Sequence, residues 1–260
     1  KWRQYAEKSR GVKRWFYQRE ARLMVNAVEN SLLFHAENKN LLQSLQKVEG
    51  VNAVSLLDMQ ITDTISQAMD IQLPGQNADT ALPPISQMGT GFDIAKAAGL
   101  TLLAGRDFSE TYQSDWYQTH GDHATAAVII TESLARKAGY NQVQDAIGQQ
   151  WLLPGDNPVL QMKVVGVVAD IQIGSALKQQ EPLILICGRS PMTYGNILLN
   201  LQPEQAFSAR SKVQQLLTDR LQRQDLQLSW LSDDYNAMYQ NQQRQTKVIA
   251  IFAALAIALT

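Results

Sequence analysis

The feature that most constrains this chain is an apolar run at its carboxyl end. Residues Val248–Leu259 read VIAIFAALAIAL, twelve apolar residues without a charge, and Thr260 follows them. A membrane-spanning helix needs about 20 such residues, so we interpret the run as the start of a spanning helix and the chain as a piece of a longer membrane protein. The alternative is a helix buried in the chain's own core. The run is apolar on every face, whereas a docked helix keeps a polar stripe, and this favours the membrane.

The amino-terminal segment is both basic and aromatic. Residues 1–22 hold eight Lys or Arg against two Glu, and five aromatic residues lie among them: Trp2, Tyr5, Trp15, Phe16 and Tyr17. This composition is typical of a helix at a lipid headgroup boundary, and an ordinary solvated helix is the equal alternative. We therefore expect residues 1–35 to form a separate, membrane-proximal segment.

Composition otherwise indicates a folded globular body. Hydrophobic residues make up 45% of the chain and charged residues 18%, and the net charge is −1. A near-neutral chain gives no electrostatic reason to expect nucleic acid as a partner. Cys187 is the only cysteine, so no internal disulfide can form, and its apolar surroundings predict a buried thiol.

Two half-motifs of helix and strand lie far apart in the sequence. Ala36–Val48 has the apolar spacing of a helix, and Val51–Leu57 reads as a strand. Ile197–Leu201 reads as a strand before a helix that starts at Pro203 and carries an apolar stripe of Phe207, Val213, Leu216, Leu217 and Leu221. Leu226–Leu231 then alternates as a strand. The pattern predicts an α+β fold with a split ferredoxin-like layer, one sheet covered by two helices.

The stretch between the half-motifs predicts a mostly β insert. Asp70–Gly91 is rich in Pro, Gly, Asn and Thr and indicates a loop. Strands are expected at Ala127–Thr131, at Leu160–Ile173 with a bulge near Gly166, and at Pro182–Cys187. One short helix is expected at Glu132–Ala138.

A polar helix leads towards the apolar run. Asp233 and Asp234 are suited to cap a helix that starts at Tyr235, and the glutamine-rich sequence as far as Gln245 contains no helix breaker. We expect this stalk helix to continue into the spanning helix as one rod over residues 233–260. Its candidate stalk residues are Tyr235, Met238, Tyr239 and Gln242.

Several of these stretches resemble the periplasmic core domain of MacB-like ABC-transporter permeases, the group that includes FtsX-type and lipoprotein-exporting permeases. Ala98–Glu110 (AGLTLLAGRDFSE) is similar to the family's GI-x-LL-x-GR-x-F segment. Ala127–Ala138 is similar to its VVINE-x-LA strand and helix. Further similarities follow in the family's order at Ala146-Ile147-Gly148, where Ala146 replaces the usual proline, at Val164–Ile171 and at Glu181-Pro182.

The resemblance implies an architecture and a role. It implies a porter-like layer over residues 36–90 and 188–232, interrupted by a Sabre-like insert over residues 91–187. It implies a bacterial inner-membrane permease whose domain lies in the periplasm and couples to ATP hydrolysis by a separate cytoplasmic ABC ATPase. The implied partners are a second permease copy or repeat, membrane lipids and a periplasmic adaptor protein.

Catalysis finds little support in the sequence. The chain contains neither a G-x-x-x-x-G-K-[ST] phosphate loop nor a G-x-S-x-G elbow, and we expect no cofactor. His120, Asp122 and His123 lie in a polar loop without further nearby ligands, so no metal is expected there. Asp107 and Glu110 have the spacing of a general acid and base, but capping of a turn or a short helix is the stronger interpretation.

The loop around the AGRDF sequence holds the remaining candidates. Arg106 is expected to fix the turn through backbone carbonyls or Asp107. Tyr112, Trp116 and Tyr117 are the candidate partner-contact residues, because aromatic side chains at a loop tip anchor partners; packing against the insert is the alternative. Two other function classes stay open: an extracytoplasmic ligand-binding sensor domain, and a hydrolase that uses the carboxylates or the histidines.

Overall fold

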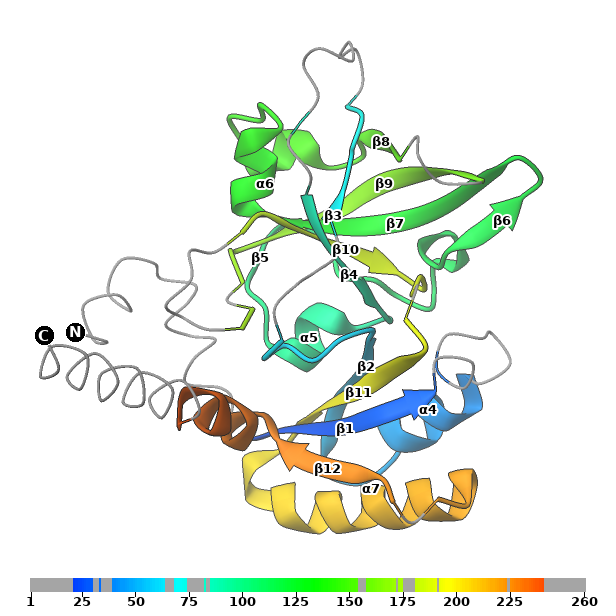
Figure 1. Cartoon of the computed structure of the whole chain (residues 1–260), viewed down its shortest axis with the longest axis vertical. Coiled ribbons are helices and arrows are strands. Elements are labelled where there is room, and N and C mark those ends of the chain that lie inside the picture. Colours follow the sequence, from blue (N-terminus) through cyan, green and yellow to red (C-terminus); the bar gives the residue numbers. More distant parts are fainter. Residues whose placement is uncertain are drawn as a thin grey trace, which may run out of the picture.

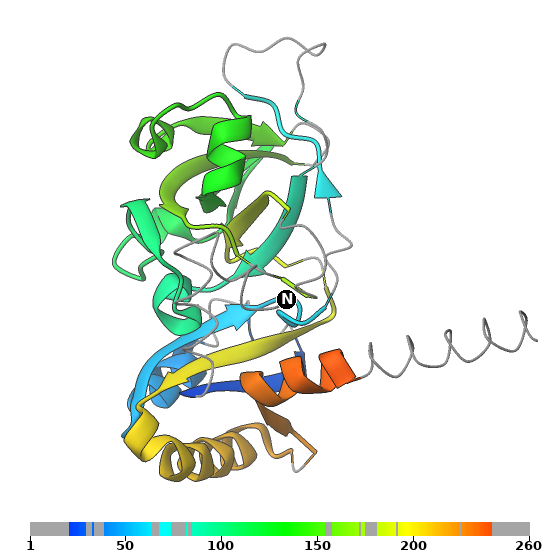
Figure 2. The same ribbon diagram turned by 90° about the vertical axis from the view of Figure 1, so that its left-hand side faces the viewer.

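One continuous sheet runs through two stacked lobes in this computed structural model (Figures 1 and 2). The structure describes residues 21–29, 33, 39–63, 68–73, 82, 85–153, 158–171, 173–174, 181–190, 192–223 and 225–240. The strands run in the order β12-β1-β11-β2-β4-β10-β7-β9-β5, with β3, β6 and β8 paired to β4, β7 and β9.

The lobe at the bottom of Figure 1 is a ferredoxin-like lobe. Its strands are antiparallel and lie in the order β12-β1-β11-β2, which is the fourth-first-third-second order of a βαββαβ unit. A helix follows the first strand and another follows the third. The elements are β1 (Arg22–Glu29), α4 (Lys39–Gln46), β2 (Val51–Leu57), β11 (Tyr194–Leu201), η6 (Pro203–Gln205), α7 (Ala206–Leu221) and β12 (Gln227–Trp230).

The insert lobe lies between the second and third strands of that unit. It combines parallel and antiparallel strands, with β10 parallel to β4 and β9 parallel to β7. Its elements are β3 (Ala68–Met69), β4 (Ile85–Thr90), α5 (Ile94–Ala98), β5 (Leu102–Gly105), η4 (Gln113–Asp115), β6 (Gln118–His120), β7 (His123–Thr131), α6 (Glu132–Lys137), η5 (Val143–Ala146), β8 (Gln150–Leu153), β9 (Val159–Val168) and β10 (Leu183–Cys187). The bulge expected near Gly166 is confirmed, because the register of β9 against β7 shifts there.

Alternate side chains of the ferredoxin-like strands point to opposite faces of the sheet and contribute to two hydrophobic cores. Leu23 and Val25 of β1 point to the face covered by α4 and α7, together with Val213 and Leu217 of α7. Met24 points to the other face. Because both faces are covered, this layer is buried on both sides.

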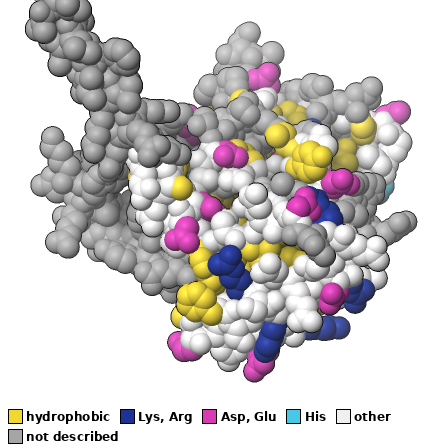
Figure 3. Space-filling model, turned by 60° about the horizontal axis from the view of Figure 1, so that its bottom comes forward, with side chains coloured by type: hydrophobic (Ala, Val, Ile, Leu, Met, Phe, Trp, Pro, Cys, Tyr) yellow, Lys and Arg dark blue, Asp and Glu magenta, His cyan; other side chains and the backbone are white. Residues whose placement is uncertain are grey.

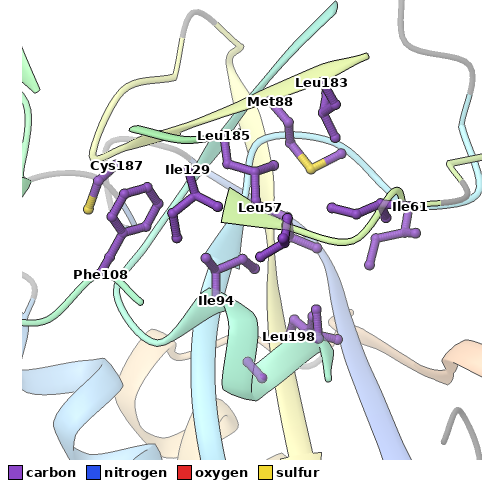
Figure 4. Close-up of a cluster of buried hydrophobic side chains, with 14 of the residues drawn as sticks. Leu57, Ile61, Met88, Ile94, Phe108, Ile129, Leu183, Leu185, Cys187 and Leu198 are labelled. Carbon is purple, nitrogen blue, oxygen red and sulfur yellow. The ribbon is translucent and has the colours of Figure 1, made fainter. Parts of the chain in front are cut away.

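The second face is shared between the lobes. One cluster combines Leu57 and Leu198 from the ferredoxin-like lobe with Phe108, Ile129 and Leu185 from the insert lobe (Figure 4). We call this cluster the shared core. This core joins the two lobes by apolar burial, in addition to the pairing of β2 with β4 at Leu57 and Thr90.

Two expectations about the boundaries do not hold. Residues 22–29, placed in the separate segment 1–35, form β1 between β12 and β11. Residues 85–90, placed in a loop and in the 36–90 half, form β4, whose main partner is β10 of the insert lobe. Helix α5 of the insert lobe packs on β2 and β11, so the insert contacts the ferredoxin-like lobe there.

Phe207 also differs from expectation. The buried stripe of α7 consists of Ala206, Ala209, Val213 and Leu217, and Phe207 lies one position off it with 78% of its surface exposed. Figure 3 shows the face around α7, where Lys and Arg side chains are interspersed with Asp and Glu. This mixture agrees with the near-zero net charge.

Residues 1–20, 30–32 and 34–35 and the apolar run Val248–Leu259 lie outside the described residues. Within the described part of the chain, no helix combines the length and the hydropathy needed to cross a bilayer.

Candidate functional site

The last described helix docks onto the shared core. Residues 231–240 are helical, and Leu231 and Tyr235 are almost fully buried. Met238 and Tyr239 are half-buried against the same cluster, and the rings of Tyr235 and Tyr239 stack with centroids 6.4 Å apart. These residues have the i, i+4 and i+3 spacing of one helix face, so that face is the docked one.

Three segments meet at the carbonyl oxygen of Ile61. The hydroxyl of Tyr235 donates to this oxygen at 3.4 Å, and the N–H of Gly174 donates to it at 2.8 Å. Ile61 follows β2 in the ferredoxin-like lobe, and Gly174 follows β9 in the insert lobe. The helix is therefore bonded at a point where segments from the two lobes meet.

The first turn of this helix is anchored to the sheet. The Asn26 amide of β1 donates to the Ser229 hydroxyl at 3.0 Å, and that hydroxyl donates to Asp234 at 2.8 Å. Burial raises the pKa of Asp234 above its usual value. The helix begins at residue 231, four residues before the expected start, so Asp234 lies inside the first turn and binds a strand side chain.

Of the four candidate stalk residues, Tyr235, Met238 and Tyr239 share the docked face, and Gln242 lies outside the described residues. Asn236, Ala237 and Gln240 are exposed on the outward side. The same buried cluster also contains Ile61 and Ile171, with Met59 and Ile173 packed against it. The sequence placed Ile171 and Ile173 in a strand over Leu160–Ile173, but β9 ends at Val168.

A second feature is the loop that joins β5 to β6. The guanidinium of Arg106 binds both carboxylate oxygens of Asp115, at 2.5 and 2.8 Å, and donates to the carbonyl of Asp107 at 3.0 Å. The N–H of Ser109 also donates to Asp115, at 3.1 Å. The expected bond to a backbone carbonyl is confirmed, and the main partner of Arg106 is a buried carboxylate nine residues further on.

The three aromatic candidates occupy different positions in this loop. Tyr112 is 49% exposed, and the Arg106 guanidinium lies 3.9 Å from its ring centroid. Trp116 is half-buried between the cores, with its ring 5.0 Å from that of Phe92. Tyr117 packs against the insert core, and its N–H donates to the carbonyl of Cys187 at 3.0 Å. Only Tyr112 of the three presents much of its ring to solvent.

The candidate carboxylates hold the local structure together. Asp107 accepts the N–H of Lys96 at 3.1 Å and that of Phe108 at 2.8 Å, so it caps the first turn of α5 from eleven residues downstream. Burial raises the pKa of Asp107. Glu110 accepts the Gln43 side chain at 3.2 Å. Asp107 has the capping role that the sequence favoured.

His120 and His123 face each other across the β6–β7 hairpin, with ring centroids 5.8 Å apart. No group of three or more metal-ligating side chains occurs among the residues the structure describes. Cys187 is fully buried, as expected, and burial raises the pKa of its thiol well above the usual value.

Comparison with solved structures shows which known proteins share this fold. No family model and no curated protein sequence matches the chain, but twelve solved chains match its structure. One is the periplasmic region of MacB from Actinobacillus actinomycetemcomitans, with a TM-score of 0.55 at 13% identity over 91% of this chain and 98% of that one. The chain has the fold of this MacB periplasmic region.

Another match is a domain of a protein described as a permease from Porphyromonas gingivalis, with a TM-score of 0.47 and 14% identity over 81% of this chain and 88% of that one. The MacB match confirms, at the level of the fold, the resemblance drawn from the sequence motifs. It spans nearly the whole of the MacB region, so both lobes take part in the likeness.

Proposed function

We propose that the chain is the periplasmic domain of an inner-membrane ABC transporter permease and that it acts as a non-catalytic mechanical transmitter. The observation that carries the proposal is the docking of helix 231–240 on the core shared by both lobes, through Leu231 and Tyr235. The MacB-like fold supports the same assignment.

The proposed mechanism is lever motion. In the intact protein this helix is a stalk that leads to the apolar run Val248–Leu259 in the bilayer, and ATP-driven closure of a cytoplasmic ABC ATPase tilts it. A tilt is passed to both lobes because the stalk face is packed into their common core, and packed cores transmit displacement with little compression. Two such domains, from a second permease copy or repeat, then approach and separate and act on a substrate or a periplasmic adaptor. Membrane lipids surround the spanning part, and the domain needs no cofactor.

Site-directed crosslinking tests this proposal. Single cysteines at Asn236, Ala237 and Gln240, which are exposed on the outward side of the helix, are introduced into the full-length permease with its ATPase. The native Cys187 is buried and its thiol pKa is raised, so it contributes little background. We expect the crosslinking yield between copies to change at least several-fold when non-hydrolysable ATP is added.

A matched cysteine at Lys137, which is exposed on α6 of the insert lobe, reports general changes in thiol reactivity. An identical pattern with and without nucleotide at all three stalk positions would exclude transmission. Tyr235→Ala is expected to weaken the nucleotide response while ATP hydrolysis continues, because it loosens the contact between helix and core.

A ligand-binding sensor domain of a membrane receptor remains the second candidate. It would need a closed apolar cavity with converging polar groups. The groove described below, about 670 Å³ in volume, lies on the surface of the insert lobe beside exposed residues such as Gln150 and Gln161. The transmitter is therefore favoured.

A further inference from the structure

A groove lies beside the Arg106 loop on the insert lobe. Its volume is about 670 Å³, within the range of roughly 300–1,000 Å³ typical of ligand sites. Strands β7 and β9 form the floor, Arg106 and Asp115 form one wall, and Ile147 and Gly148 form the other. All of these elements are well separated from the docked helix 231–240 in the chain.

The floor combines small apolar groups with polar side chains. Thr125 of β7 lies opposite Gln161 of β9, and Ala127 lies opposite Lys163. On its other side Lys163 lies opposite Gln150 of β8. Alternate residues of a strand share one face, so hydroxyl and amide side chains flank the buried Ala127. The hydroxyl and amide groups can bond the backbone of an extended peptide, and the apolar part of the lining can receive its side chains.

The charge of the groove favours a carboxylate. Arg106, Asp115 and Lys163 are the charged residues of its lining. Arg106 and Asp115 pair with each other through two contacts, so their charges offset. Lys163 is exposed and forms no ion pair with any other residue in the described ranges. One positive charge is left beside the apolar floor.

We propose that this groove binds the carboxyl-terminal end of an extended polypeptide, with the terminal carboxylate at Lys163 and the last side chain, an apolar one, over Ala127. The proposal goes beyond the transmitter function and does not depend on it. It gives the chain a ligand class, the free carboxyl-terminal end of a polypeptide.

Fluorescence anisotropy of the complete 260-residue chain tests the assignment. The probe is a fluorescein-labelled Gly-Ser-Gly-Ala-Val-Leu peptide, prepared with a free carboxyl terminus and, separately, as the terminal amide. We expect the amide to bind at least tenfold more weakly, because it lacks the charge that Lys163 recognises. Lys163→Gln is expected to lower the affinity for the free-acid peptide to that for the amide, and to leave the affinity for the amide unchanged.

Two further variants complete the design. Lys137→Gln removes an exposed lysine on α6 and is expected to leave binding intact. Thr125→Tyr fills the groove from a partly exposed strand position and is expected to weaken both peptides. The proposal is overturned if the protein binds the acid and the amide equally, or binds neither. It is also overturned if Lys163→Gln and Lys137→Gln change the affinity equally, or if laurate displaces the peptide at lower concentration than unlabelled peptide does. The measurement uses no nucleotide, so its failure is distinguishable from failure of the crosslinking test.

Discussion

Trp116 lies directly against Gly188. A Cβ built on Gly188 would come within 2.4 Å of the indole Cδ2 atom, and the glycine has a φ of +75°. The N–H of Gly188 donates to the carbonyl of Thr90 at 2.8 Å. The Arg106 loop thus packs against the chain where β10 ends, beside the place where β2 pairs with β4.

Gly188→Ala is therefore expected to lower the free energy of unfolding by about 2–4 kcal/mol, the sum of a positive-φ penalty and a forced shift of the indole. Gly139→Ala is the matched control, since Gly139 has a φ of +91° and a Cβ added there would meet no atom within 4 Å, and it should cost only about 1 kcal/mol. Urea denaturation measures both. Equal losses of free energy of unfolding in the two variants would show that Trp116 can move away from residue 188 at little cost.

Tyr235 is expected to contribute mainly through its ring. Tyr235→Ala removes a fully buried aromatic side chain and should cost about 3–5 kcal/mol. Tyr235→Phe removes only a hydroxyl whose bond to Ile61 is long, at 3.4 Å, and should cost less than about 1 kcal/mol. Chemical denaturation compares them, with Gln240→Ala as an exposed control. A large loss in the phenylalanine variant would instead make the hydroxyl the anchor.

Arg106 and Asp115 are expected to show strong coupling. Arg106→Gln leaves Asp115, whose side chain is 2% exposed, without its bidentate partner, and should cost about 2–3 kcal/mol because the orphaned charge stays buried. The double variant Arg106→Gln with Asp115→Asn should recover part of that loss. A double variant less stable than the single one would contradict this account. Equilibrium unfolding of the parent, the two single variants Arg106→Gln and Asp115→Asn, and the double variant gives the coupling.

Asp58 is expected to make stability depend on pH. It is 3% exposed, and burial raises its pKa to about 7, against about 3.9 in an unfolded chain. The folded protein therefore holds a proton that the unfolded chain releases. Protonated Asp58 therefore contributes stability to the folded state. This contribution is complete below about pH 4 and is lost as pH rises through about 7.

Asp58→Asn should remove that dependence. Its free energy of unfolding should fall less between pH 5 and pH 8 than that of the parent chain, by on the order of 2–4 kcal/mol. Arg189 attracts the carboxylate and offsets part of the burial effect. Asp122→Asn, at the exposed hairpin tip, serves as control. Parallel pH profiles for parent and Asp58→Asn would refute the shift.

The elements with local signals were predictable from the sequence. Strand β2 has the expected bounds Val51–Leu57, and α6 begins at the expected Glu132. Both have the side-chain periodicity of their type, because each packs one or two regular faces against a core.

The misplaced elements depend on distant partners. Strand β1 follows a basic stretch, and its Arg22 reads as exposed, yet that side chain is buried and its Nε donates to the carbonyl of Ala97 at 2.9 Å. Strand β4 (ISQMGT) has no apolar alternation and is defined by pairing with β10, about a hundred residues later. No window of local sequence contains either relationship.

The candidate sites divide in the same way. The aromatic residues on one face of helix 231–240 were predictable from their spacing. Ile61 lies in an irregular loop, and its bond with Tyr235 follows only from the fold. Ile171 and Ile173, expected within a strand, lie past the end of β9, in or against the same buried cluster. The Arg106–Asp115 pair likewise joins two loop residues that only the folded chain brings together.

The position of β1 also has a consequence for biogenesis. Its neighbours on both sides are β11 and β12, and Asn26 pairs with Gln227, about 200 residues later in synthesis. At roughly 5–20 residues per second, translation needs on the order of 10–40 s to deliver that partner. For most of this interval the newborn strand RLMVNAVE has neither of its final hydrogen-bonding neighbours, so the ferredoxin-like sheet can close only after nearly the whole domain has been synthesised.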